Sequence, residues 1–220
     1  MRTDDFYHLL HDALSRRLKI PYINVNIIVE SSIHGRLHQR CAHRSRTWNR
    51  NFWNFILATQ TAVATIATNF GAGYISIKRP SAAMTAYGAG TLVGTCIGLV
   101  NDSNYGILAG RGTDAEDFNG FTLTTPITHG SGANQLSHRA QAASAQVYTA
   151  GTKTWDITLT RLFDNTSGNT ITVTEAGLFY YYPGYGHSWM NSRDLLATPV
   201  DVLNNGVLSI SYPLQVVFPN

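Results

Sequence analysis

The last third of the chain carries the pattern that most restricts the fold. In TWDITLTRLF (residues 154–163), Trp, Ile, Leu, Arg and Phe at odd positions alternate with Asp, Thr and Leu at even positions, as in a β-strand with one buried face. Turn-forming residues at 164–169 separate this strand from a second β-rich run, 170–182. Near the end, Asn204-Asn205-Gly206 stands between two further β-like runs and predicts a hairpin, because Asn-Gly adopts positive φ at little cost.

The C-terminal part as a whole is expected to be β structure. From residue 71 onward, short apolar runs alternate with turns rich in Gly, Asn and Thr, which is typical of sandwiches and jelly rolls. The predicted fold class is therefore mainly β, an antiparallel β-sandwich or jelly-roll-like domain. Three units are expected: an N-terminal helical extension (1–21), a strand-hairpin subdomain with a helix near 47–67 (22–70), and the β-sandwich domain (71–220).

Residues 3–19 have the pattern of an amphipathic helix. Thr3 can cap it, and its acidic first turn and basic last turn oppose the helix dipole. Pro21 ends it. We expect this helix to dock either on its own domain or on a neighbouring subunit. Its apolar stripe consists of Phe6, Leu9, Leu10, Ala13 and Leu14.

Charge is scarce in this chain. Hydrophobic residues make up 44% of it and charged residues 13%, against the usual ~25%. Because interfaces are depleted in charge, this composition favours a protein that assembles with copies of itself or with partners. Cys41 and Cys96 are too few for a disulfide framework and are expected to be buried free thiols. The apolar stretches 55–67 and 89–100 are too short and too polar to span a membrane, so no membrane partner is expected.

Positive charge is concentrated near the N-terminus. Residues 1–60 contain nine Lys or Arg and four Asp or Glu. If 36–43 forms a strand, Arg36, His38 and Arg40 should share one face. This basic stretch could contact nucleic-acid phosphates, acidic surfaces of neighbouring subunits, or solvent, and protein or solvent contact is favoured. The interface candidates in it are Arg36, Arg40, Arg44, Arg46 and Arg50.

No sequence pattern assembles a catalytic or cofactor site. The glycines at 88–94 imitate a dinucleotide loop, but the third comes one residue late and the strand-before, helix-after context is missing. His129 and His138 have no carboxylate or cysteine at ligand spacing, so no metal site is predicted. The stretch 110–113 lacks the Lys-Ser/Thr pair of a phosphate loop and is interpreted as a turn. We expect no cofactor, no metal and no enzyme activity.

Glu175 is a carboxylate within an otherwise apolar β region. A buried carboxylate needs an ionic partner or backbone N–H donors. Arg161 is the ionic candidate, and backbone N–H groups are the alternative. Glu175 and Arg161 are therefore predicted to form a structural pair.

An aromatic run at 179–189 is the best candidate for an exposed contact. Its strand part, 179–182, is assigned to packing, and its Gly-containing loop, 183–189, to a contact. Tyr and Trp suit both sugar stacking and protein interfaces, because each has a flat apolar face and a polar tip. Glycan and protein both remain open as partners of this loop. The contact candidates are Tyr185, His187 and Trp189.

Five segments of the chain stand out when they are taken in order. They are TWNRNFWNF (47–55), NYGILAGRGT (104–113), PITHGSGANQL (126–136), ITLTRLFDNTSGNTITVTEAGL (157–178) and LLATPV (195–200). Together they resemble uncharacterised virion proteins of tailed bacteriophages, and TVTEAGL is similar to E-x-G-L segments of phage tail-fibre and baseplate-associated proteins. The resemblance implies a particle component with a β-sandwich body and carries over no catalytic residue.

Three functions fit such a chain. The leading hypothesis is a structural protein of a tailed phage particle, in its tail, baseplate or neck, located in the virion after assembly in the host cytoplasm. Its partners would be other virion proteins and copies of itself in a symmetric oligomer. The alternatives are a capsid decoration (cement) protein and a carbohydrate-binding module for receptor recognition.

Overall fold

The computed structural model describes residues 22–45, 52, 76–78, 80, 84–86, 95–183 and 186–218. The elements of this part are strands joined in antiparallel sheets, so the predicted mainly β class is confirmed. The two predicted helices, 3–19 and 47–67, lie outside the described residues except for Phe52.

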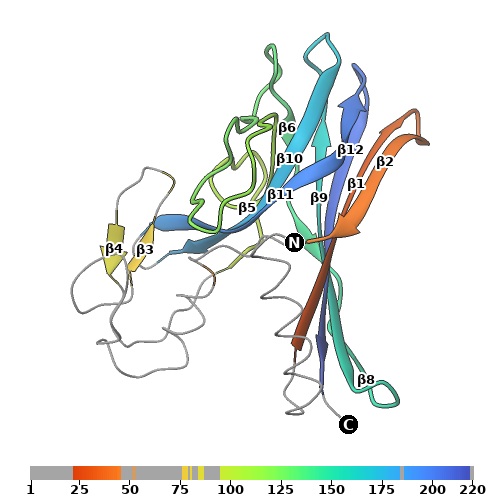
Figure 1. Ribbon diagram of the computed structural model, residues 1–220. Coiled ribbons are helices and arrows are strands. Elements are labelled where there is room, and N and C mark those ends of the chain that lie inside the picture. The colour runs from red at the N-terminus through yellow and green to blue at the C-terminus, as the bar shows by residue number, and fades with distance from the viewer. Residues whose placement is uncertain are drawn as a thin grey trace.

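The larger sheet has seven strands (Figure 1). Its long strands lie in the order β2–β1–β12–β9, and three short strands pair with the outer edge of β9. The alternation seen in the sequence of β9 is matched by its burial, since Leu159, Arg161 and Phe163 point inward. The strands are β1 (Tyr22–Ile33), β2 (Arg36–Arg44), β12 (Val207–Val217), β9 (Thr154–Asp164), β6 (Ser137–His138), β7 (Ala142–Ala143) and β8 (Val147–Thr149).

The smaller sheet has three strands in the order β11–β10–β5. A separate pair, β3 with β4, completes the described elements. The strands are β11 (His187–Val202), β10 (Ile171–Tyr182), β5 (Gly106–Gly110), β3 (Ser76–Lys78) and β4 (Met84–Ala86).

The two sheets share one apolar core. Val25, Ile27 and Val29 of β1 are almost completely buried and belong to the same cluster as Leu178 of β10 and Val200 of β11. Apolar burial of this kind is the main favourable term in folding. Strand β1 pairs with β12 along most of its length, so the sheet runs continuously across the predicted boundary near residue 70.

Only some of the turns join neighbouring strands. His34 and Gly35 form the two-residue turn of the β1–β2 hairpin, with φ of 50° and 73°, as a type I′ turn requires. The predicted hairpin at 204–206 is wrong, because β11 and β12 belong to different sheets. The turn itself forms, with Asn205 at φ 63° and the Gly206 N–H donating to the Leu203 carbonyl, but it carries the chain from one sheet to the other.

Asn165 links the β11–β12 connection to the β9–β10 connection by hydrogen bonds. The β9–β10 connection also carries the chain from one sheet to the other. The side-chain amide of Asn165 donates to the carbonyls of Asn169 and Val202, both at 2.7 Å. Its backbone N–H donates to the Gly206 carbonyl at 2.9 Å. The residue is completely buried, so these hydrogen bonds have no water to replace them.

Replacing Asn165 with Ala is expected to lower the free energy of unfolding by about 2–4 kcal/mol, because the buried Val202 carbonyl loses its donor and the turn loses the side-chain hydrogen bonds to Asn169 O and from Ser167 N. The matched control is Asn169→Ala, whose exposed side chain makes one long hydrogen bond and should cost less than about 1 kcal/mol. Urea unfolding measures both. Equal losses in the two variants would contradict the role of Asn165.

Candidate interaction surface

Arg161 is the most unusual side chain of the core. It is completely buried on the inner face of β9, and no carboxylate of the described residues lies within ion-pair distance of it. All three guanidinium nitrogens instead donate to backbone carbonyls, and burial lowers the pKa of the group. The acceptors are Arg139 O (3.0 Å), Tyr105 O (3.2 Å), Ile107 O (3.0 Å), Leu99 O (2.7 Å) and Asp102 O (2.7 Å).

These hydrogen bonds fix the loop 97–105, which precedes β5. Gln141 adds to them, because its side-chain amide donates to the Cys96 carbonyl and accepts from the Ile107 N–H, both at 2.7 Å. Gly98 leaves the space for the guanidinium, since a Cβ there would lie 2.8 Å from Arg161 Nη1. The loop is therefore held from beneath by buried side chains.

Glu175 holds a second loop, 111–125, at the other end of β5. Its carboxylate accepts from the N–H groups of Gly112 (2.9 Å), Thr125 (2.8 Å) and Thr124 (3.2 Å). Its partner in charge is Arg193, whose Nε donates to Glu175 Oε2 at 2.5 Å with both side chains buried.

Arg193 extends the same support to the tip of this loop. Its two terminal nitrogens donate to the carbonyls of Asp114 (2.9 Å) and Ala115 (3.2 Å). The Glu116 carboxylate accepts from the Leu195 N–H at 2.9 Å. We call the stretches 97–105 and 111–125 the pinned loops.

The predicted pair of Glu175 with Arg161 is wrong. A register shift after Val173 turns Glu175 to the outer side of the three-stranded sheet, whereas Arg161 points between the two sheets. The expectation that Glu175 needs a charge partner or backbone donors is met by Arg193 and the loop amides. Arg193 and Gln141 were not found from the sequence; the adjacent charges Arg193-Asp194 between the aromatic run and Leu195-Leu196 were the available signal.

The pinned loops expose apolar side chains. Leu99 and Val100 are 62% and 60% exposed, and Phe118 is 47% exposed. Arg161 binds the Leu99 carbonyl directly, and Arg193 binds the loop that carries Phe118 at Asp114 and Ala115, so these side chains project from loops that are held in place. An exposed apolar side chain on a rigid loop loses little conformational entropy on binding, which favours a protein contact.

The basic strand is arranged differently from the expectation. Strand β2 carries an extra residue at His38, since Gln39 lies opposite Ser31 but Leu37 lies opposite Ser32. Arg40 and Leu37 therefore share the outer face, and Arg36 lies on the other, so the predicted common face is wrong.

The remaining arginines of this group are placed as follows. Arg40 pairs with Glu30 at 2.9 Å in an exposed ion pair of little energetic weight. Arg44 ends β2, whereas Arg46 and Arg50 lie outside the described residues.

The aromatic run packs inward. Trp189 is completely buried, lies opposite Tyr180 in the β10–β11 ladder and contacts its ring at 4.6 Å between centroids. The predicted exposed contact at Trp189 is wrong, because β11 begins at His187 and leaves only a short turn. His187 is half-buried opposite Tyr182, and Tyr185 lies outside the described residues.

Two buried titratable groups, Asp194 and His138, have shifted pKa values. The Asp194 carboxylate accepts from Ser45 Oγ (2.9 Å) and Tyr212 Oη (3.1 Å), and burial raises its pKa to about 6. The His138 ring contacts Phe163 edge-on, and its Nδ1 donates to the Asp102 carbonyl at 2.9 Å. Burial lowers the pKa of His138 to about 4, so the ring is neutral near pH 7.

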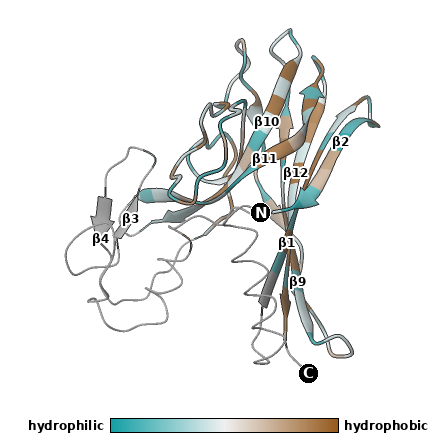
Figure 2. Ribbon diagram, viewed as in Figure 1, coloured by the Kyte–Doolittle hydropathy of each residue, from teal (hydrophilic) through white to brown (hydrophobic). Residues whose placement is uncertain are grey.

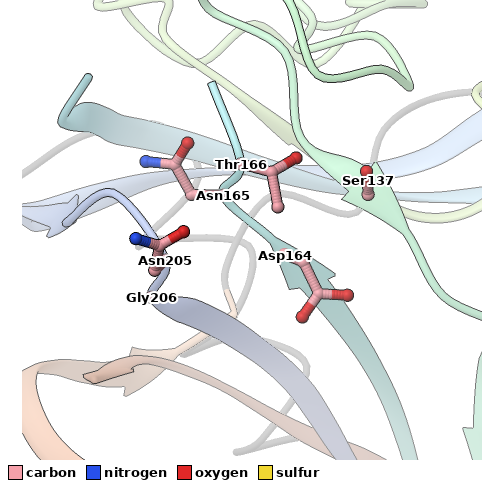
Figure 3. A pocket seen from close by; sticks show the side chains of 6 residues that line it. All are labelled: Ser137, Asp164, Asn165, Thr166, Asn205 and Gly206. Atoms are coloured by element: carbon pink, nitrogen blue, oxygen red, sulfur yellow. The ribbon is translucent and has the colours of Figure 1, made fainter. Parts of the chain in front are cut away.

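A hollow of about 270 Å³ lies where the turns 164–166 and 205–206 meet β6 (Figure 3). Its walls are polar, but Asp164 is already paired with Arg139 and the Asn165 amide is engaged in backbone hydrogen bonds. Within the described ranges, no group of three His, Cys, Asp or Glu side chains is placed to hold a metal ion. In the same part of the chain, no helix is long and apolar enough to cross a bilayer.

Comparisons of the chain with protein-family models, with curated proteins and with solved structures find no match.

Replacing Arg161 with Met is expected to lower the free energy of unfolding by about 3–5 kcal/mol, because five backbone carbonyls each lose a hydrogen bond from the guanidinium in the core. Arg139→Gln serves as control, since its ion pair with Asp164 is half exposed and should contribute less than about 1 kcal/mol. Denaturant unfolding distinguishes the two. A loss below about 1 kcal/mol for Arg161→Met would refute the account.

Acid is expected to destabilise the wild-type chain more than a His138→Gln variant. The pKa of His138 is about 4 when folded and 6.5 when unfolded, so its contribution is complete above about pH 6.5 and is lost as pH falls toward 4. The difference should reach about 3 kcal/mol. The raised pKa of Asp194 changes stability with pH in the opposite direction. This effect is the same in both proteins, so it cancels in the difference between them. Urea unfolding midpoints of both proteins, measured across this pH range, test the predicted difference. Midpoints that fall in parallel with decreasing pH would contradict it.

Proposed function

We propose that this chain is a structural component of a tailed bacteriophage particle, in the tail, baseplate or neck, and that it acts through protein–protein interfaces in the virion. Its two sheets form a β-sandwich body, and its partners are other virion proteins and further copies of itself. The order of the five sequence segments that resemble virion proteins supports this proposal. The scarcity of charged residues supports it as well.

The observation that carries the proposal is the construction of the pinned loops. Two buried arginines and a buried glutamate fix the backbone of both loops. The same loops expose Leu99, Val100 and Phe118 to solvent. Rigid loops with apolar tips suit a permanent contact with a neighbouring subunit, where the binding energy is not spent on ordering the surface.

The functional test uses tailed particles purified from the phage that encodes this chain. The chain should be found in intact particles at a fixed copy number, and labelled antibodies should locate it at the tail, baseplate or neck by electron microscopy. Labelling over the capsid surface would favour the decoration alternative instead. A chain present only in the unassembled fraction would overturn the proposal.

Variants then test the surface itself. Leu99→Asp and Phe118→Asp should each lower incorporation into particles by about tenfold or more, because they place a charge in an apolar contact. Val147→Asp is the matched control, since Val147 is 53% exposed but lies away from the pinned loops on β8. Equal incorporation of all three variants would exclude the pinned loops as the interface.

A further inference from the structure

The seven-stranded sheet continues beyond the core at one end. In Figure 1 the lower parts of β1, β9 and β12 run on past the level of β10 and β11. The burial of side chains follows this arrangement. On the inner face of β9, Phe163 is 0% and Leu159 7% exposed, whereas Trp155 is 41% exposed.

The inner face of this projecting end is apolar. Leu214 and Ile157 form the last row that still packs against the core. In the next row, Val216 lies beside Trp155, which lies beside Tyr148 of β8. The apolar colour at the end of β12 is visible in Figure 2. We call this surface the sheet end; it consists of Tyr148, Trp155, Ile157, Leu214, Val216 and Phe218.

Three aromatic rings gather at its outer corner. The rings of Tyr148 and Trp155 lie 5.8 Å apart, and those of Tyr148 and Phe218 lie 6.4 Å apart. Tyr148 is 50% exposed, so the cluster has one open side. Aromatic side chains left at a projecting sheet face mark a surface that another element covers.

The position of the N-terminal segment indicates which element this is. Strand β1 begins at Tyr22, which lies opposite Val217 and therefore starts at the sheet end. The preceding residues 3–19 have the sequence of an amphipathic helix with one apolar stripe. From β1 across β12 and β9 to β8 is about 14 Å at the usual strand spacing, and a helix of this length measures about 25 Å, so it can cross the whole surface.

We propose that the sheet end is the docking surface for residues 3–19 of the same chain, with Leu10 and its neighbours in the stripe placed against Trp155 and Val216. Pro21 connects this segment directly to β1. A tether this short gives the segment a millimolar effective concentration at its own sheet, which favours docking in the same chain over exchange with another copy. This inference is independent of the proposed role in a particle.

Trypsin tests the docking in the full-length protein, because Arg16, Arg17 and Lys19 provide cleavage sites within the segment. Leu10→Asp and Trp155→Ser should each raise the initial cleavage rate at these sites by about tenfold, since cleavage follows the population of the open form. The double variant should cleave no faster than either single one, because both changes remove the same contact.

Two controls match these variants. Ser15→Asp places the same charge opposite the stripe of the predicted helix. Val147→Ser changes β8 on the outer face of the sheet, beside Asp156 and not beside Trp155. Both should stay within about twofold of wild type. Leu10→Asp leaves the described sheet unchanged, so the test stands even if Trp155→Ser weakens the fold. Unchanged cleavage in Leu10→Asp would overturn the proposal.

A cross-link identifies the chain that supplies the segment. In a Leu10→Cys, Val216→Cys variant, mild oxidation should give a disulfide within one chain, which migrates as a monomer. Mixing isotopically labelled and unlabelled protein before oxidation should give no mixed product. Mixed dimers, or no disulfide at all, would contradict docking within the same chain.

Discussion

A single buried cation organises much of this molecule. Arg161 enters the space between the two sheets from β9, and all its hydrogen bonds to the described residues go to backbone carbonyls. Burying a guanidinium is costly unless its donors are satisfied, so the backbone around it must adopt one arrangement. The carbonyls come from the loop before β5, from β5 itself and from the segment after β6. The cation thereby sets the path of a loop that carries no regular structure of its own.

The carboxylate of Glu175 fixes the loop 111–125 on the outer side of the smaller sheet. It accepts hydrogen bonds from backbone N–H groups, whereas Arg161 donates hydrogen bonds to backbone carbonyls. Arg193 balances the charge of Glu175. Gly112 makes the approach possible, since a Cβ there would lie 2.5 Å from the carboxylate. Both pinned loops therefore belong to the rigid body of the protein. That rigidity is what allows their exposed apolar side chains to serve as a contact surface.

The sequence predicted local features well and long-range pairing poorly. The alternation in 154–163 correctly indicated a strand with one buried face, since alternation is a local property. Asn204–Gly206 correctly indicated a turn, but a turn does not specify whether the next strand joins the same sheet. Glu175 was recognised as needing partners; a register shift, invisible in the sequence, gave it Arg193. Trp189 was misplaced because the β10–β11 turn is shorter than the aromatic run suggested.

The central claim is that buried charges make the pinned loops as rigid as the sheets. Amide hydrogen exchange of the unmodified protein, resolved by residue, tests it most directly. The account predicts that the N–H groups of Gly112, Thr124 and Thr125, which donate to the buried Glu175 carboxylate, exchange as slowly as those in the centre of β9 and β12. Exchange of these three amides at the rate of an open, solvent-exposed loop would contradict it.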